Sequence, residues 1–192
     1  MRPGRPRSLA AALAAALLVA GCGGGSSDRA RKPDTPKAAP VPYGYTPVRA
    51  GRVMFAHPAG WKAMARPPQG WLYGADLRGG DGTEVRAGVI GKVPQVPAAA
   101  LVADAASSGV ELNAVGVQRG ANRTLKIPGA REAVRVDYTY ATREGRTPDH
   151  RGTDVSVVWG AGSAAVVRIT GPQAGLTPAQ IDPIVRTIGI GP

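Results

Sequence analysis

The sequence contains few of the residues that usually carry protein chemistry. Of its 192 residues, one is cysteine, two are histidine and one is phenylalanine. A lone cysteine cannot form a disulfide within the chain, so a disulfide scaffold is excluded and core packing must hold the fold. Because aromatic residues make up only 5% of the chain, we expect a core built mainly from alanine, valine and other small apolar side chains.

The spacings of common catalytic and phosphate-binding motifs are also missing. A Gly-x-Ser-x-Gly elbow is not present, since Gly162-Ser163 is followed by two alanines. The glycines between Gly79 and Gly82 lack the downstream Lys-Ser/Thr of a phosphate loop. Carboxylates do not occur in pairs at a recognisable catalytic spacing. We therefore predict that the protein is not an enzyme and that it has no catalytic residues, no metal and no cofactor.

The two histidines are the remaining candidates for a site. We expect His57, in an aromatic segment, to face solvent or cap a turn. His150 has Asp149 beside it and Asp154 four residues later. A strand would place His150 and Asp154 on one face, where they could pair or supply two metal ligands. A third ligand is not identifiable, and a solvated charged loop over 143–152 is the favoured interpretation.

The N-terminus has the pattern of an export signal. Three arginines precede an apolar run over 9–20, which is shorter than the roughly 20 residues of a membrane-spanning helix. Val19-Ala20-Gly21-Cys22 resembles the bacterial lipobox, whose cysteine is linked to diacylglycerol and becomes the first residue after cleavage. The resemblance predicts a signal peptide over 1–21 and a lipid anchor at Cys22, on the extracytoplasmic face of the cell membrane. An ordinary secreted protein with an incidental cysteine is the alternative.

Most of the formal net charge of +11 belongs to the N-terminal part. From Val53 onward the chain has 15 Lys and Arg residues and 11 Asp and Glu residues. Because these charges nearly balance, a nucleic-acid partner is not expected. Residues 22–50 are rich in Gly, Ser and Pro and are predicted to form a flexible tether. Its basic side chains could meet anionic lipids or wall polymers, or simply be solvated. The basic residues between Gly23 and Arg52 are Arg29, Arg31, Lys32, Lys37, Arg49 and Arg52.

Residues 51–192 are predicted to form a single domain dominated by alternating apolar and polar residues. Such alternation is typical of strands with one buried and one solvated face in an antiparallel sheet. A short Gly-containing loop joins the last two strands into a hairpin. The predicted strands are 71–77, 84–93, 134–140, 155–159 and 165–169.

The C-terminal helix has the stronger of two helix signals. Thr177 is a suitable N-cap, Pro178 suits the first helical position, and Gln180 completes a capping box. An apolar stripe follows, and Gly189 is expected to stop the helix. The stripe consists of Ile181, Ile184, Val185 and Ile188.

A second helix is predicted over 97–108, with Leu101, Val102 and Ala105 on its apolar side and Gly109 at its end. An antiparallel sheet with two helices packed against it defines an α+β fold.

Two segments resemble a known family. Phe55-Ala56-His57-Pro58-Ala59-Gly60-Trp61 resembles the F-x-x-P-x-G-W opening of the PsbP-like and LpqN-like group. The segment from Val167 to Pro172, with the helix that ends at Ile188, is similar to the group's closing strand and helix. The resemblance implies an α+β domain. For the LpqN-like branch, whose members are exported actinobacterial lipoproteins, it also implies an envelope location, and no shared catalytic set comes with it.

These observations predict a lipid-anchored envelope lipoprotein whose domain is a non-enzymatic binding or scaffolding module for another envelope component. A carrier of a lipid or other apolar small molecule is the alternative, and it would need an apolar cavity of roughly several hundred Å³ between the sheet and the helices. An envelope hydrolase that uses His57 and His150 is a third possibility. We expect Trp61 and Trp71 to fill the core, although exposed aromatic rings could form a binding face.

Overall fold

The computed structural model describes residues 39–79, 84–93, 96–143 and 147–192, which belong to the compact unit Thr35–Pro192. The predicted signal peptide, Cys22 and most of the predicted tether lie outside the described residues, as does most of the predicted turn at 78–82. Among the residues that are described, no helix is long and apolar enough to cross a membrane.

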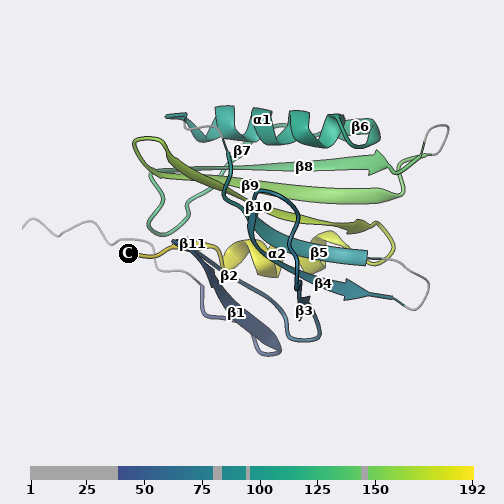
Figure 1. Ribbon diagram of the computed structural model, residues 1–192, viewed down its shortest axis with the longest axis horizontal. Helices are drawn as coiled ribbons and strands as arrows, with labels where there is room; N and C mark the ends of the chain where they lie inside the picture. Colours follow the sequence, from purple (N-terminus) through teal and green to yellow (C-terminus); the bar gives the residue numbers. More distant parts are fainter. Residues whose placement is uncertain (1–38, 80–83, 94–95, 144–146) are drawn as a thin grey trace, which may run out of the picture. The chain divides into compact units, whose positions relative to one another are not determined.

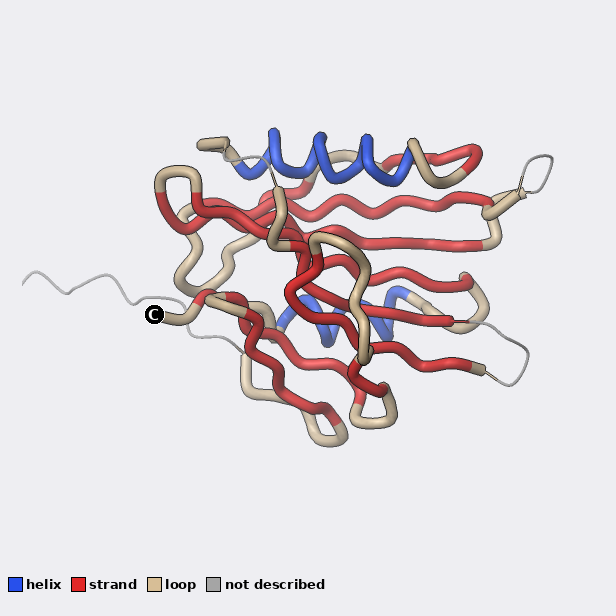
Figure 2. Tube along the Cα trace, in the orientation of Figure 1, coloured by secondary structure: helices blue, strands red, loops and turns tan. Residues whose placement is uncertain are grey.

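Strands are the main regular structure of the described residues (Figure 2) and form two antiparallel sheets. The large sheet has the order β3-β4-β5-β10-β9-β8-β6, with β7 also paired to β8, and the small sheet has the order β1-β2-β11. The large sheet comprises β3 (Lys62–Ala63), β4 (Trp71–Arg78), β5 (Glu84–Ile90), β10 (Ser163–Pro172), β9 (His150–Gly160), β8 (Glu132–Ala141), β6 (Val115–Arg119) and β7 (Arg123–Thr124). The small sheet comprises β1 (Tyr45–Ala50), β2 (Val53–Pro58) and β11 (Gly189–Ile190).

Two helices, α1 (Ala99–Glu111) and α2 (Pro178–Arg186), pack on opposite faces of the large sheet (Figure 1). Side chains that alternate along β9 enter two different cores. Val157 packs with the small sheet and α2, whereas Val158 packs with α1. The predicted α+β class, an antiparallel sheet with two helices packed against it, is confirmed.

The predicted strands are present, and the face of β8 that was expected to be solvated is only partly open. Val134, Val136 and Tyr138 pack toward α1. On the opposite face, Asp137 is 37% exposed, whereas Arg135 reaches α2. The side chain of Arg135 is only 12% exposed and donates a hydrogen bond to Asp182 of α2 at 2.7 Å. Polar side chains on a strand therefore do not require solvent when another element supplies the partner.

The start of α2 confirms the prediction made from its capping residues. Thr177 is the N-cap, and its backbone N–H donates to Gln180 Oε1 at 2.7 Å. The predicted apolar stripe of α2 is buried. The helix ends at Arg186, however, because Thr187 is the C-cap, and Gly189 begins β11 rather than ending the helix.

The sequence-based description of α1 was partly wrong. The helix continues through Gly109 to Glu111, since glycine is tolerated in a helix at a cost of about 1 kcal/mol. Val102 is buried as expected, but Leu101 and Ala105 are exposed. The side of α1 that packs on the sheet carries alanine, serine and valine instead of leucine, which lets the helix lie close to the sheet. The buried residues of α1 are Ala99, Val102, Ala103, Ser107 and Val110.

The fold begins before the predicted boundary at residue 51. Tyr45–Ala50, expected to belong to the tether, form β1 and pair with β2 from Tyr45↔Pro58 to Ala50↔Val53. Pro47 is compatible with this strand because β1 is an edge strand. The sequence predicts a spacer for this segment because its proline-rich surroundings are typical of a tether and not of a strand.

Candidate functional site

The α1 side of the large sheet carries an open cleft at the C-terminal end of α1. This cleft, called the α1 cleft below, has a volume of about 390 Å³. Aromatic and cationic side chains from four strands meet the last turn of the helix there. Its lining includes Trp71, Arg86, Asn113, Tyr138, Tyr140 and Arg168.

A second cleft of about 570 Å³ continues from the α1 cleft, because both are lined by Arg86, Tyr140 and Thr170. The second cleft also contains Glu84 and His150. We refer to the two together as the α1 groove. Arg86 lies at the junction of the two clefts and donates a hydrogen bond to Glu84 at 3.2 Å.

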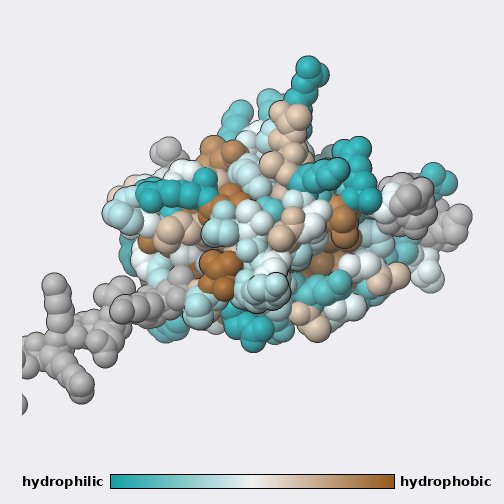
Figure 3. Space-filling model, turned by 90° about the horizontal axis from the view of Figure 1, so that it is seen from below, coloured by the Kyte–Doolittle hydropathy of each residue, from teal (hydrophilic) through white to brown (hydrophobic). Residues whose placement is uncertain are grey.

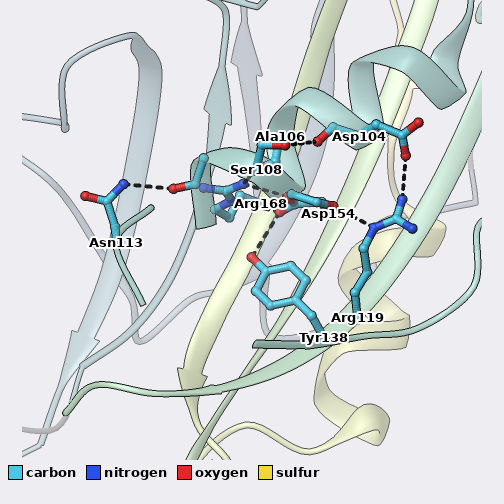
Figure 4. Close-up of polar contacts among 10 residues, drawn as sticks. Asp104, Ala106, Ser108, Asn113, Arg119, Tyr138, Asp154 and Arg168 are labelled. Atoms are coloured by element: carbon cyan, nitrogen blue, oxygen red, sulfur yellow. Dashed lines mark hydrogen bonds and ion pairs between the residues drawn. The ribbon is translucent and has the colours of Figure 1, made fainter. Parts of the chain in front are cut away.

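A buried ion pair forms the floor of the α1 groove (Figure 4). Arg168 donates from Nε to Asp154 Oδ1 at 2.8 Å and from Nη2 to Asp154 Oδ2 at 2.6 Å. Nη2 also donates to the carbonyl of Ala106 in α1 at 2.9 Å. Asp154 is fully buried, so its charge depends on this partner. Burial acts to lower the pKa of Arg168, but the hydrogen bonds and charge of Asp154 raise it overall.

Tyr138 completes this network as a neutral hydrogen-bond donor. Its hydroxyl lies 3.2 Å from Asp154 Oδ1. Burial, followed by the charge of Asp154, raises the pKa of Tyr138 well above its usual value. The phenol therefore stays protonated at neutral pH, and the network is a rigid support rather than a set of acid–base groups.

Two glycines in the large sheet make room for the aromatic rings of the groove. A Cβ on Gly88 would lie 2.2 Å from the ring of Trp71, and a Cβ on Gly152 would lie 2.3 Å from the ring of Tyr138. Each ring thus lies against a strand at a position where any side chain would displace it. The glycines explain how two large rings fit beside a buried ion pair.

The structure contradicts the expectation that His57 faces solvent. Its side chain is 2% exposed and lies between the rings of Trp61 and Tyr73, each with a centroid 6.1 Å away. Nε2 is 3.0 Å from the Tyr73 hydroxyl, and Nδ1 is 2.9 Å from the carbonyl of Pro58. His57 is therefore a packed core residue.

His150 lies in the groove, but not in the arrangement considered from the sequence. It begins β9 rather than lying in a loop, and its Nδ1 is 2.7 Å from Asp149 Oδ1. Asp154 is bonded to Arg168 and Tyr138 instead of His150. Within the described ranges, no group of three His, Cys, Asp or Glu side chains could hold a metal ion.

The tryptophans divide between the two roles considered for them. Trp61 is buried in the core, whereas Trp71 is partly buried and lines the α1 cleft. Arg168 is a site residue that was not predicted from the sequence. Its position in the apolar run Val166–Ile169 was a signal, because a charged residue on a buried strand needs a buried partner.

Fold and site together define a small α+β domain with an open groove in which aromatic and cationic side chains surround a fixed ion pair. The sequence matches no protein-family model and no curated protein. Among solved structures, the fold is similar to that of Mycobacterium tuberculosis LpqN, a protein involved in cell envelope biogenesis, with a TM-score of 0.52 and 16% identity over 77% of this chain and 91% of LpqN. It is also similar to the Saccharomyces cerevisiae Ran-binding protein Mog1p, with a TM-score of 0.50 and 11% identity over 76% of this chain and 95% of Mog1p. At these identities the likeness establishes the fold, which agrees with the LpqN-like fold predicted from the sequence.

Proposed function

We propose that the protein is a lipid-anchored cell-envelope lipoprotein whose folded domain binds a partner protein without catalysis. The anchor would be Cys22, and the docking surface would be the α1 groove with the C-terminal end of α1. The observation that carries the proposal is a large exposed apolar side chain, Leu112, beside a groove lined by Trp, Tyr and Arg.

Leu112 directly follows α1 and is 85% exposed, and Val115 near it is also exposed. The residues between them, Asn113 and Ala114, line the α1 cleft. Protein interfaces are enriched in Trp, Tyr and Arg, and these residue types contribute most of the binding energy. The apolar rim and the groove therefore form one surface with the composition of a protein interface.

The side of the molecule away from α1 differs from this surface. In Figure 3, which shows that side, hydrophobic residues form small separate patches among hydrophilic ones. Scattered apolar residues are normal on a protein surface and do not indicate a partner.

Contacts within the groove hold several of its side chains in place before a partner binds. Arg168 is fixed by Asp154 and by α1, and Trp71 is fixed against Gly88, so few side chains lose freedom when a partner docks. Arg86 is about two-fifths exposed and could exchange Glu84 for an acidic group of the partner.

The envelope location is supported by the lipobox-like residues 19–22 and by the fold likeness to LpqN, itself a protein of envelope biogenesis. Mog1p, the second protein of similar fold, is Ran-binding. A protein of similar fold thus binds another protein. The basic tether would meet anionic lipids or wall polymers close to the anchor.

An apolar-ligand carrier is less well supported by the groove. A carrier would enclose its ligand in a cavity lined mainly by apolar side chains. The α1 groove is open, and Arg86, Arg168 and Glu84 are among its lining residues.

The test is photo-crosslinking in intact cells with a photoreactive amino acid at position 115 of the full chain. We expect a discrete crosslinked partner protein, and we expect Leu112→Asp to abolish it. Leu101→Asp is the matched control, because Leu101 is 51% exposed near the start of α1, whereas the residues of α1 that line the groove, Gly109 and Val110, lie at the other end of the helix beside Leu112. This variant should crosslink normally. Equal crosslinking of both variants would overturn the proposal. A lipid found in the groove by native mass spectrometry would favour the carrier.

A further inference from the structure

A separate cleft of about 620 Å³ lies on the other face of the large sheet, where the first turn of α2 meets β8 and β9. We call it the α2 cleft. Three of the arginines that line it, Arg123, Arg135 and Arg151, come from neighbouring strands. Asp137 and Asp182 are its acidic residues.

Both carboxylates of the α2 cleft are already used by the first two arginines. Arg135 donates to Asp137 at 2.9 Å and to Asp182 at 2.7 Å. Arg123 pairs with Asp137 as well, and Asp137 also accepts a hydrogen bond from Thr153 at 2.6 Å. Arg123 and Arg135 are therefore compensated within the cleft.

Arg151 is held by a neutral group instead. Its Nη2 donates to the side-chain oxygen of Gln173 at 3.1 Å, and Gln173 is itself fixed through a hydrogen bond to the carbonyl of Pro148 at 2.9 Å. The Nε of Arg151 is buried and has no hydrogen-bond partner among the residues that the structure describes. Arg151 forms no ion pair with any described residue. A partly buried guanidinium without a counter-charge is costly, and a bound anion is one way in which proteins satisfy such a group.

We propose that the α2 cleft binds a small oxyanion of the phosphate type, and that Arg151 supplies its counter-charge. A guanidinium offers planar N–H donors that match phosphate geometry, and the bonds between them are charge-assisted. The first turn of α2 also reaches the cleft through Pro178 and carries no acidic residue, so the positive end of the helix adds to the attraction. The source is either a free phosphate compound or a lipid phosphate headgroup.

This site is independent of the docking surface proposed above. The α2 cleft and the α1 groove lie on opposite faces of the large sheet and share Tyr138 as a lining residue, but neither Arg151 nor Leu112 belongs to both. A negative result at one therefore leaves the other unaffected.

The experiment measures thermal unfolding and calorimetric binding of the full chain in neutral detergent, with sodium phosphate exchanged for sodium chloride at constant ionic strength. We expect phosphate to raise the Tm of the native chain. Arg151→Met should bind phosphate at least about tenfold more weakly, because one charge-assisted contact is lost. In chloride its Tm should be no lower than that of the native chain, since an uncompensated charge has been removed.

Two further variants keep the test decisive. Arg78→Met removes the same charge from a side chain that is 73% exposed on β4, and it should leave phosphate binding unchanged. Asp182→Asn removes a negative charge from the α2 cleft and should tighten phosphate binding. This prediction remains testable even where Arg151→Met does not fold.

A second arm distinguishes the two sources of the phosphate. Short-chain phosphatidylglycerol or phosphatidylcholine is added to the micelles of the native and Arg151→Met chains. A response to free phosphate that depends on Arg151 indicates a soluble ligand, and one confined to phosphatidylglycerol indicates a headgroup. Absence of both responses, or equal responses in the native and Arg151→Met chains, would overturn the proposal.

Discussion

Arg168 and Asp154 lie directly opposite each other on β10 and β9 and are joined by two hydrogen bonds. The same guanidinium reaches the carbonyl of Ala106 in α1. One ion pair thus joins two strands to the helix that covers them. Among the described residues, two other polar links hold α1 on the sheet: Arg119 of β6 donates to Ser107 and Asp104, and Glu132 of β8 accepts from the backbone N–H of Ala99. Of the three, the Arg168 link is the one made by a buried ion pair.

Replacing Arg168 by methionine should lower the free energy of unfolding by about 3–5 kcal/mol, because Asp154 would remain as a buried charge without a partner. Urea denaturation followed by circular dichroism measures the change. The double variant Asp154→Leu/Arg168→Met should recover most of the loss, since no uncompensated charge is left. A double variant no more stable than Arg168→Met would show that the pair itself provides net stability. The exposed Arg78→Met is the control, expected to change stability by less than about 0.5 kcal/mol.

Tyr138 should make the fold sensitive to alkaline pH. Burial and then Asp154 raise its pKa, so the folded protein keeps the phenolic proton where the unfolded chain has lost it. The free energy of unfolding should therefore decrease as the pH rises above about 10, the usual pKa of tyrosine, and Tyr138 should have no such effect at lower pH. Urea titrations between about pH 7 and pH 11 test this expectation.

Tyr138→Phe should show a shallower alkaline decrease, together with a loss of about 1 kcal/mol at neutral pH from the missing hydrogen bond to Asp154. Tyr43→Phe, at a fully exposed tyrosine, should behave like the native chain at every pH. An unchanged alkaline slope in Tyr138→Phe would contradict the assignment.

Gly88→Ala should open or deform the α1 cleft, because the new Cβ would lie 2.2 Å from the ring of Trp71. We expect a red-shifted tryptophan emission, a loss of about 1–3 kcal/mol in stability and weaker crosslinking from position 115. Gly109→Ala is a control for stability alone, since nothing lies within 4 Å of a Cβ there and α1 already includes the position, but Gly109 itself lines the α1 cleft. That variant should be as stable as the native chain or slightly more stable.

Cys22→Ser should release the protein from the membrane fraction and abolish incorporation of labelled palmitate, because the thiol is the proposed point of lipid attachment. Ser26→Ala, a nearby change in the predicted tether, should remain membrane-bound and labelled. Fractionation with immunoblotting measures both. Membrane association of Cys22→Ser equal to that of the native chain would remove the anchor from the proposed function.

The fold could be predicted from the sequence where its signals are local. The start of α2 depends on Thr177, Pro178 and Gln180, which are neighbours in the chain. Strands such as β5 and β8 also show their alternation directly. By contrast, Leu101 and Val102 are both apolar, and only the close approach of α1 to the sheet decides that Val102 is buried.

The site was much harder to predict because its residues meet through strand pairing. Asp154 and Arg168 lie 14 residues apart, and their contact follows from the register of β9 and β10. The burial of His57 likewise depends on Tyr73 and Trp61, which only the fold brings around its ring. A register is set by the whole sheet, so no short motif reveals these contacts.

The place of β1 at the edge of the small sheet has a mechanical consequence. A pull on the chain before residue 42 acts first on the turn closed by the hydrogen bond from Tyr45 N–H to Pro42 O, at 3.2 Å. It then acts on the bond from Ala59 N–H to Gly44 O, at 2.8 Å, and along the antiparallel pair of β1 and β2. A pull away from β2 would break these bonds one after another, starting at Tyr45. The large sheet, with the α1 groove and the α2 cleft, would keep its shape while the edge strand yields.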